Sequence, residues 1–418
     1  MMLLGRFFIR LLIVYLFIFI FPFPLDQIPF GIGNVISGWV GSFWEWFIPL
    51  FSKNIIGYTD EISFVSRGSG DTTYDYLLLA GRLSISIVVV LFWSTIDKVG
   101  KESRSFGTLM ILLRYYLAFA MFTYGFSKVF YLQFPELNLM SLTVTYGNSS
   151  PMGLLWKFMG YSETYSLFTG LIEVLGGFLL LFRYTKIFGA IIILGVMVNV
   201  FLLNMSFDVP VKLFSFHLCL ISIVVLMPDF RNIVRFLILN KPTDPPIINT
   251  YFLSKKKNLM SYAAKGILLF YVLFNVIESK LQSQGLYGKR VPKHELYGIY
   301  DIQIFVVNND TLPPMLTDTI RWKKLIIDKR NSLVIKMDDR RIGMRHEIDS
   351  FASSIKLTPY LNSNKQYNLE FKKMDSLLYL NMIDGKDTIT ITSLKHEKED
   401  FFLVQRGFNW INEYPMNR

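Results

Sequence analysis

The chain has 418 residues, of which 52% are hydrophobic and 18% charged, with 38 Phe and 22 Tyr. This composition, together with several apolar runs of about twenty residues, indicates a polytopic membrane protein and excludes a purely soluble globular protein. The formal net charge of +11 is spread along the chain without a nucleic-acid-binding motif, so we exclude nucleic acid as a partner and expect membrane lipids instead.

Seven stretches are long and apolar enough to cross a bilayer. The predicted spans are 7–24, 76–96, 110–131, 163–182, 186–206, 212–228 and 259–281. The first resembles a signal peptide, but no small-residue cleavage site follows it, so we expect it to be retained as a span. The aromatic stretch Trp39–Phe51 holds three Trp and is short for a span. We predict that it lies along the membrane interface.

Basic residues alternate between the loops and predict the orientation of the spans. The loops predicted to be inside contain Arg6, Arg10, Lys98, Lys101, Arg104, Arg183, Lys186, Arg231, Arg235, Lys241 and Lys255–Lys257. The loops predicted to be outside contain only Lys53, Arg67, Lys157 and Lys212. This predicts an inner-membrane protein with a cytoplasmic N-terminus and a periplasmic C-terminal domain. Merging 186–206 and 212–228 into one re-entrant unit would instead place the C-terminus inside.

The composition changes after Gln282, where short alternating runs typical of β-strands follow one another. They are 299–308, 320–328, 331–338, 340–348, 353–358, 367–374, 376–383, 388–394 and 400–406. Asp384-Gly385 between two of them is a hairpin signal. We predict an all-β antiparallel domain, either a barrel or a sandwich, because closure protects the strand edges. The predicted domains are 1–107 (N-terminal spans and the interfacial segment), 108–228 (helix bundle), 229–281 (basic loop and last span) and 282–418 (periplasmic β domain).

Glu173 lies near the middle of the apolar stretch Leu167–Arg183. A carboxylate at this depth costs about 2.5–3.5 kcal/mol on insertion scales, so such residues usually have a partner or a function. Gly170 before it and Gly176-Gly177 after it fall on roughly the same helical face, which predicts close approach of another helix. Two interpretations stay open at this point: a structural, hydrogen-bonded or ion-paired Glu, and a working site.

Other costly polar residues fall at similar depths, mostly in the outer half of the spans. They are Lys128, Tyr124, Arg82, Asn199 and His217. We predict that they form an outward-facing polar pocket with Glu173, in which Lys128 and Glu173 are the catalytic candidates and the other four bind ligand. Each also has an ordinary explanation. The cations can extend to the headgroups, and the tyrosine, amide and imidazole can be packing or interhelical contacts.

The run Arg114–Lys128, then Glu173 with Gly176-Gly177, then the basic turn Arg183–Lys186, resembles the DoxX-like family over residues 108–228. The resemblance implies a four-helix membrane bundle and, by the family's name, an association with thiosulfate:quinone oxidoreduction, hence a quinone as cofactor. The chain differs from that pattern by two spans before the bundle, one after it and a β domain. Its ending, 406–418, resembles Bacteroidota proteins that carry such a bundle.

Two functions follow from these features. The first is a redox or lipid-handling membrane protein whose pocket binds a quinone or lipid. The second is a non-enzymatic scaffold or assembly factor whose periplasmic β domain binds an exported or membrane protein. A weaker third is a barrel that carries an apolar ligand to the bundle. The single Cys219 excludes a CxxC redox pair, and His294, His346 and His396 are too scattered to predict a metal site.

Overall fold

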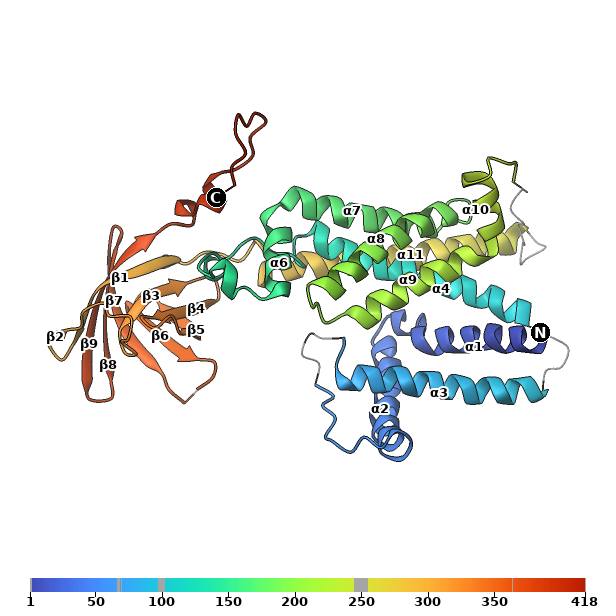
Figure 1. Ribbon diagram of the computed structural model, residues 1–418, viewed down its shortest axis with the longest axis horizontal. Helices are drawn as coiled ribbons and strands as arrows, with labels where there is room; N and C mark the ends of the chain where they lie inside the picture. The colour runs from blue at the N-terminus through green and yellow to red at the C-terminus, as the bar shows by residue number, and fades with distance from the viewer. Residues whose placement is uncertain are drawn as a thin grey trace. The chain divides into compact units, whose positions relative to one another are not determined.

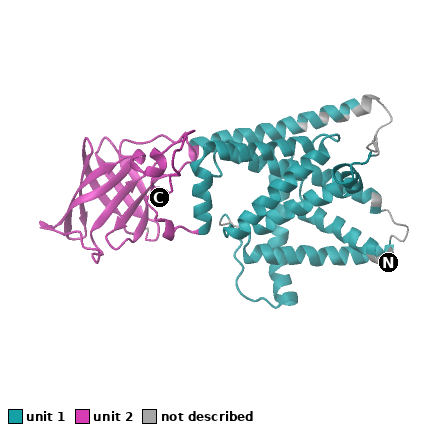
Figure 2. Ribbon diagram, turned by 45° about the horizontal axis from the view of Figure 1, so that its top comes forward, with its two compact units in different colours: residues 1–135, 151–285 teal, residues 136–150, 286–418 magenta. Residues whose placement is uncertain are grey.

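The computed structural model describes all residues except 1, 66–67, 69, 97–101, 244–254, 363 and 418, and gives the backbone alone for 2–4, 103, 255–258, 261, 264 and 268. Among the basic residues used for orientation, Arg67, Lys98, Lys101 and the side chains of Lys255–Lys257 therefore lie outside the description. The chain forms two compact units (Figure 2). One contains residues 1–135 and 151–285, and the other contains 136–150 and 286–418.

The first unit is helical. Its helices are α1 (Met2–Ile20), α2 (Ile32–Phe51), α3 (Thr73–Ile96), α4 (Glu102–Val129), α6 (Pro151–Tyr161), α7 (Glu163–Leu180), α8 (Lys186–Ser206), α9 (Lys212–Leu226), α10 (Phe230–Leu237) and α11 (Lys255–Leu286). Short turns of 3-10 or π helix follow α1, α2 and α9, at Leu25–Gln27, Ser52–Ile56 and Met227–Asp229. The helical pattern of the sequence is thus reproduced at each predicted span.

Six helices among the described residues are long and apolar enough to cross a membrane. They cover Gly5–Gln27, Thr73–Ile96, Arg104–Val129, Glu163–Leu180, Lys186–Ser206 and Lys212–Leu237. α8 and α9 are separate members of this set, which disfavours merging them into one re-entrant unit. The seventh predicted span, 259–281, is helical as part of α11 but is not among the six. α2 is longer than the predicted interfacial stretch, is not among the six either, and runs across the direction of α1 and α3 (Figure 1).

The four helices α4, α7, α8 and α9 pack as a bundle, with α4 against both α7 and α9 and with α8 against both α7 and α9. Glycines permit the closest of these contacts. A Cβ atom on Gly170 would lie 2.7 Å from the Gly125 carbonyl oxygen and 2.8 Å from the Lys128 Cβ. Such distances leave no room for a side chain, so α4 and α7 approach through backbone contact. Of the predicted small-residue face around Glu173, Gly170 and Gly177 lie against α4, whereas Gly176 lies against Ile193 of α8.

The second unit is a closed antiparallel β-barrel of eight strands. They are β1 (Gly298–Val307), β3 (Trp322–Ile327), β4 (Asn331–Lys336), β5 (Arg341–Asp349), β6 (Ser354–Pro359), β7 (Tyr367–Met374), β8 (Leu377–Asp384) and β9 (Asp387–His396). β1 closes the ring because it pairs with both β3 and β9, with Ile299 opposite Ile326 on one side and His396 on the other. A two-residue strand, β2 (Asp310–Thr311), extends the end of β1. The barrel alternative is thus confirmed over the sandwich.

The local strand predictions are largely confirmed, with one error. β8 and β9 form a hairpin in which Asp384 pairs with Asp387 and Gly385 adopts a φ of 69°, as the Asp-Gly signal predicted. The predicted strand 400–406 is wrong. It contains the short helix α12 (Phe402–Gln405), preceded by a 3-10 turn at Lys398–Asp400. Glu397 and Asp400 cap this turn reciprocally, and such local hydrogen bonds favour a helical turn over an extended strand.

Apolar side chains fill the barrel interior. The largest buried ones include Tyr300, Phe305 and Trp322, surrounded by Leu, Ile, Val and Met from every strand of the ring. An eight-stranded barrel is just wide enough for its own side chains, and here they occupy it. This packing argues against the barrel as a carrier of an apolar ligand.

Residues 136–150, which connect α4 to α6 in the chain, belong to the barrel unit. Leu139, at the start of α5 (Leu139–Leu142), is fully buried in a cluster with Ile299, Ile326 and Leu333. Its backbone N–H donates to Asp328 Oδ2 over 3.0 Å. The Arg341 guanidinium donates to the carbonyl oxygens of Met140 and Thr143, each over 3.0 Å. The predicted boundary at 282 therefore misses one part of the barrel unit, since no strand pattern marks this connection.

Candidate functional site

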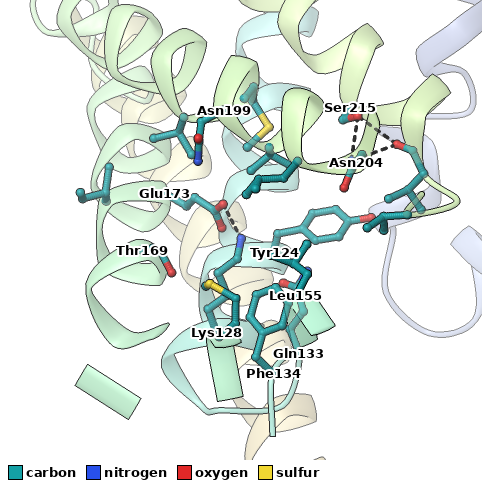
Figure 3. A pocket seen from close by; sticks show the side chains of 18 of the residues that line it. Tyr124, Lys128, Gln133, Phe134, Leu155, Thr169, Glu173, Asn199, Asn204 and Ser215 are labelled. Atoms are coloured by element: carbon teal, nitrogen blue, oxygen red, sulfur yellow. Dashed lines mark hydrogen bonds and ion pairs between the residues drawn. The ribbon is translucent and has the colours of Figure 1, made fainter. Parts of the chain in front are cut away.

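The α4–α7 contact brings Lys128 and Glu173 together. The Lys128 ammonium donates a hydrogen bond to Glu173 Oε1 and forms an ion pair with it (Figure 3). Both side chains are removed from solvent, with 7% of Lys128 and 1% of Glu173 exposed. The helices can place the pair here because Gly125 and Gly170 let α4 and α7 approach within reach of the lysine side chain. The two residues expected to form the charged centre of the site thus contact each other directly.

The pair leaves one strong acceptor unused. Glu173 Oε2 is buried and has no hydrogen-bond partner among the described residues. A carboxylate oxygen removed from water without a donor is costly, because the carboxylate normally accepts several hydrogen bonds. The same holds for Gln133 Oε1, which is also buried without a partner in the described part of the chain. Both groups would be satisfied by a ligand that offers hydrogen-bond donors.

Glu173, Lys128 and Gln133 line one cavity of about 340 Å³ within the helical unit. Its polar lining also includes Tyr124, Thr169, Asn199, Asn204 and Ser215. The remaining wall is mainly apolar and aromatic, from Phe134, Leu155, Trp156, Met159, Phe168, Ile172, Met197, Leu203 and Phe214, among others. Figure 3 shows the Lys128–Glu173 pair between Thr169, Asn199 and Tyr124. A mostly apolar cavity with a few converging polar groups is the usual form of a small-molecule site.

Four polar residues of the cavity were not predicted as site residues from the sequence: Gln133, Thr169, Asn204 and Ser215. Asn204 donates to Ser215 Oγ over 3.0 Å, which links the end of α8 to the start of α9. The sequence held only a weak signal for two of them, which is closeness to a predicted site residue: Asn204 lies five residues after Asn199, and Gln133 lies five after Lys128. Only the fold shows that these residues border one cavity.

Two of the six predicted site residues, Arg82 and His217, are not among the residues lining this cavity. Arg82 lies on α3, which packs against α1 and α2, and its guanidinium is 5.4 Å from the Phe19 ring centroid and 5.6 Å from that of Trp44. His217 stacks on Phe19 at 4.1 Å. Its Nδ1–H donates to the Leu213 carbonyl, which leaves Nε2 to accept from the Tyr15 hydroxyl. Arg82 and His217 thus belong to an aromatic cluster around Phe19, apart from the Lys128–Glu173 pair.

The barrel histidines form a different arrangement. The ring centroids of His294 and His346 are 5.1 Å apart, although the residues are distant in sequence. Ser332 Oγ lies 2.8 Å from His346 Nδ1, and His396 pairs instead with Asp301. Burial, with a smaller contribution from His294, lowers the pKa of His346 to about 4. Among the described residues no group of three or more His, Cys, Asp or Glu is placed to hold a metal ion.

No protein-family model and no solved structure matches the chain. A stretch of 119 residues is 35% identical to the uncharacterized protein YwoB of Bacillus subtilis (strain 168). The matched stretch makes up 28% of this chain and 75% of YwoB. That relative is uncharacterized, so the similarity indicates a family relationship but assigns no function. On this similarity the chain belongs to the same family as YwoB.

Proposed function

We propose that this protein is a DoxX-like integral membrane protein whose bundle cavity binds the polar head of a quinone or lipid for redox or lipid-linked chemistry. The observation that carries the proposal is a buried ion pair with one unpartnered carboxylate oxygen in an otherwise largely apolar cavity. An amphipathic molecule suits this lining, because its ring or chain contacts the aromatic wall while its head reaches the polar groups.

The chemistry of the pair suggests a role for each member. The Lys128 ammonium can donate to a ligand carbonyl or phosphate oxygen while it stays paired with Glu173. Glu173 Oε2 can accept a hydrogen bond from a ligand hydroxyl, such as that of a quinol. Tyr124 and Asn199 would then hydrogen-bond the head from the neighbouring walls.

The proposed location is the inner membrane, with the N-terminus cytoplasmic and the barrel periplasmic. The support is the distribution of basic residues between alternate loops. Single-cysteine accessibility tests this orientation. In a Cys219→Ser background, a membrane-impermeant thiol reagent applied to spheroplasts should label Ser376→Cys in the barrel. It should label Lys186→Cys only after lysis, and the reverse pattern would contradict the proposal.

Glu173→Gln tests the ligand-binding role. The amide keeps the size of the side chain but loses the negative charge and the proton-accepting oxygen pair. We expect at least a tenfold weaker binding of short-chain ubiquinol and menaquinol analogues to the purified full chain. The yield of folded protein should be unchanged, because the amide oxygen can still accept a hydrogen bond from the Lys128 ammonium. Glu163→Gln, at the exposed start of α7, is the matched control. If Glu173→Gln instead loses the folded protein from the membrane, the pair is structural; unchanged binding rejects the proposal.

A second candidate function is a scaffold whose barrel unit binds an exported or membrane protein. One observation favours it. After α12 the chain exposes a row of large apolar residues, with 77% of Phe408, 90% of Trp410, 80% of Ile411 and 85% of Tyr414 accessible. Aromatic residues of this kind often anchor protein contacts.

Removing 407–418, or changing Trp410→Ala, should then abolish crosslinking to a partner while leaving the bundle cavity unaffected. This short truncation is a cleaner test than removal of the whole barrel, because it leaves Leu139 covered. Persistence of the same crosslinks in the truncated chain would contradict the scaffold function.

A further inference from the structure

A second cavity, of about 400 Å³, lies within the helical unit on another face of α4. Phe119 and Thr123 of α4 line it, whereas Tyr124 and Lys128 line the first cavity. Its other walls are the segment from Asp26 to Gly31 with Asn34 of α2, and residues between Tyr271 and Lys280 of α11. The two cavities are therefore separate sites that share one helix.

Opposite charges line this second cavity without neutralising each other. Asp26 Oδ1 is buried and has no hydrogen-bond partner among the described residues, while Oδ2 accepts from the Gln27 side-chain amide over 2.8 Å. Lys280, half-buried on the α11 side, makes no ion pair or hydrogen bond with any described residue. An acid and a base that face one cavity unpaired are complementary to a molecule that carries both charges.

The remaining lining divides between polar and apolar groups. Asn34, Thr123, Asn275 and Ser279 can supply neutral hydrogen bonds. Ile28, Val272 and Val276 give apolar wall, and Phe30 at the rim has 96% of its surface exposed. The cavity is bordered by α4 and by the end of the apolar stretch Gly5–Gln27, both of which are able to cross a membrane. Apolar surface beside charged groups in this setting suits a ligand whose charged head continues into an acyl chain.

We propose that this cavity binds the headgroup of a zwitterionic phospholipid that carries a primary ammonium, as in phosphatidylethanolamine. The ammonium donates to Asp26 Oδ1, and the phosphate accepts from Lys280 with help from Asn275 or Ser279. A primary ammonium is favoured over a quaternary one because Asp26 Oδ1 lacks a hydrogen-bond donor, and trimethylammonium has no N–H to offer. The site is independent of the ligand bound by the Lys128–Glu173 cavity.

Lipid discrimination by the unmodified protein is the first test. The full chain is delipidated in mild detergent and titrated with phosphatidylethanolamine, phosphatidylcholine or phosphatidylglycerol of equal acyl composition, and bound lipid is counted by native mass spectrometry. We expect at least tenfold tighter binding of phosphatidylethanolamine than of either other lipid. Equal affinities would overturn the proposal. If water-soluble phosphoethanolamine at the same concentration competes fully with phosphatidylethanolamine, the ligand of this cavity is a soluble zwitterion and not a lipid.

Two substitutions test which residue binds the ammonium of the lipid headgroup and which binds its phosphate. Asp26→Asn should abolish the preference for phosphatidylethanolamine over phosphatidylcholine, and Lys280→Met should weaken the binding of both lipids. Glu278→Gln on the same helix, outside the lining, is the matched control and should change neither. The proposal is contradicted if Asp26→Asn still prefers phosphatidylethanolamine over phosphatidylcholine and Lys280→Met binds both lipids as tightly as the unmodified protein does. The lipid would then bind at another site. If one variant does not fold, the other variant and the lipid preference of the unmodified protein still test the proposal.

Discussion

Lys128 in the helical unit and His346 in the barrel unit are a buried and a half-buried titratable group, and they are accommodated in opposite ways. In the bundle, Lys128 meets Glu173, and each charge compensates the other. In the barrel, His346 meets a second base, His294, and its lowered pKa keeps the imidazole neutral at physiological pH. Burial and one hydrogen bond are enough to stabilise a titratable group in its neutral form, as at His346. A group that keeps its charge in a largely apolar cavity needs an oppositely charged partner. The charged Lys128–Glu173 pair therefore marks the bundle cavity, and not the His346 site, as the candidate functional site.

Lys128→Met gives the largest expected effect on this comparison. Removal of the ammonium leaves Glu173 buried without compensation, and breaking a buried pair in this way typically costs about 3–5 kcal/mol. The free energy of unfolding of the purified full chain in detergent measures the loss.

The double variant Lys128→Met, Glu173→Leu is its control. Because no charge remains, we expect most of the stability to return. A double variant as unstable as Lys128→Met alone would show that the lysine stabilises the bundle by packing and not by its charge.

Gly170→Ala should give an intermediate effect. The new Cβ would lie 2.7 Å from the Gly125 carbonyl oxygen, so α4 and α7 must separate. Overpacking of this kind costs roughly 1–3 kcal/mol, and it should also weaken ligand binding because it moves Lys128 away from Glu173. Gly107→Ala on α4, where the added Cβ meets nothing within 4 Å, is the matched control. Equal effects of the two substitutions would mean that the glycine contact does not set the geometry of the pair.

His346 should give the smallest effect, confined to the barrel and to acidic pH. Its pKa is about 4 in the folded protein, whereas an unperturbed histidine titrates near 6.5. Between these values the unfolded chain binds more protons. The contribution of His346 is therefore full above about pH 6.5 and is lost as the pH falls toward 4. Because the imidazole is partly exposed, we expect roughly 1–2 kcal/mol over this range.

Hydrogen-exchange protection factors of β4 and β5 at pH 7 and pH 4.5, in which the intrinsic pH dependence of amide exchange is divided out, measure this loss. His346→Asn, which can still hydrogen-bond Ser332, should flatten the pH dependence, and His396→Asn should leave it in place. If the protection factors of the unmodified barrel were the same at both pH values, the neutral His346 would not contribute to its stability.

Periodicity predicted the parts of the fold that depend on local pattern. Runs of apolar residues located the spans, and two-residue alternation located β1 and β3–β9, because one face of each strand is buried in the barrel. The Lys128–Glu173 contact was also within reach of the sequence, since a lone acid and a lone base at similar depth have few other partners. The strand expected at 400–406 failed because its alternation is short and its capping residues favour a turn.

What the sequence did not predict depends on packing between distant segments. His217 is on α9 only two residues from Ser215, yet Ser215 borders the bundle cavity and His217 stacks on Phe19 of α1. Two residues are separated by about 200° around a helix, so these side chains lie on nearly opposite faces, and depth alone does not distinguish them. The docking of 136–150 on the barrel rests on one buried leucine and on hydrogen bonds to its backbone, which no periodic pattern encodes.

That docked segment also constrains how often the chain crosses the bilayer. Residues 136–150 and 286–418 share one apolar core, so both must lie on the same side of the membrane. The chain between them must therefore cross an even number of times. α7, α8 and the helix from Lys212 are long and apolar enough for three crossings, and α11 is the other long helix that the structure describes between the two segments. With these three crossings, parity requires α11 to span as well, as the apolar run 259–281 predicts.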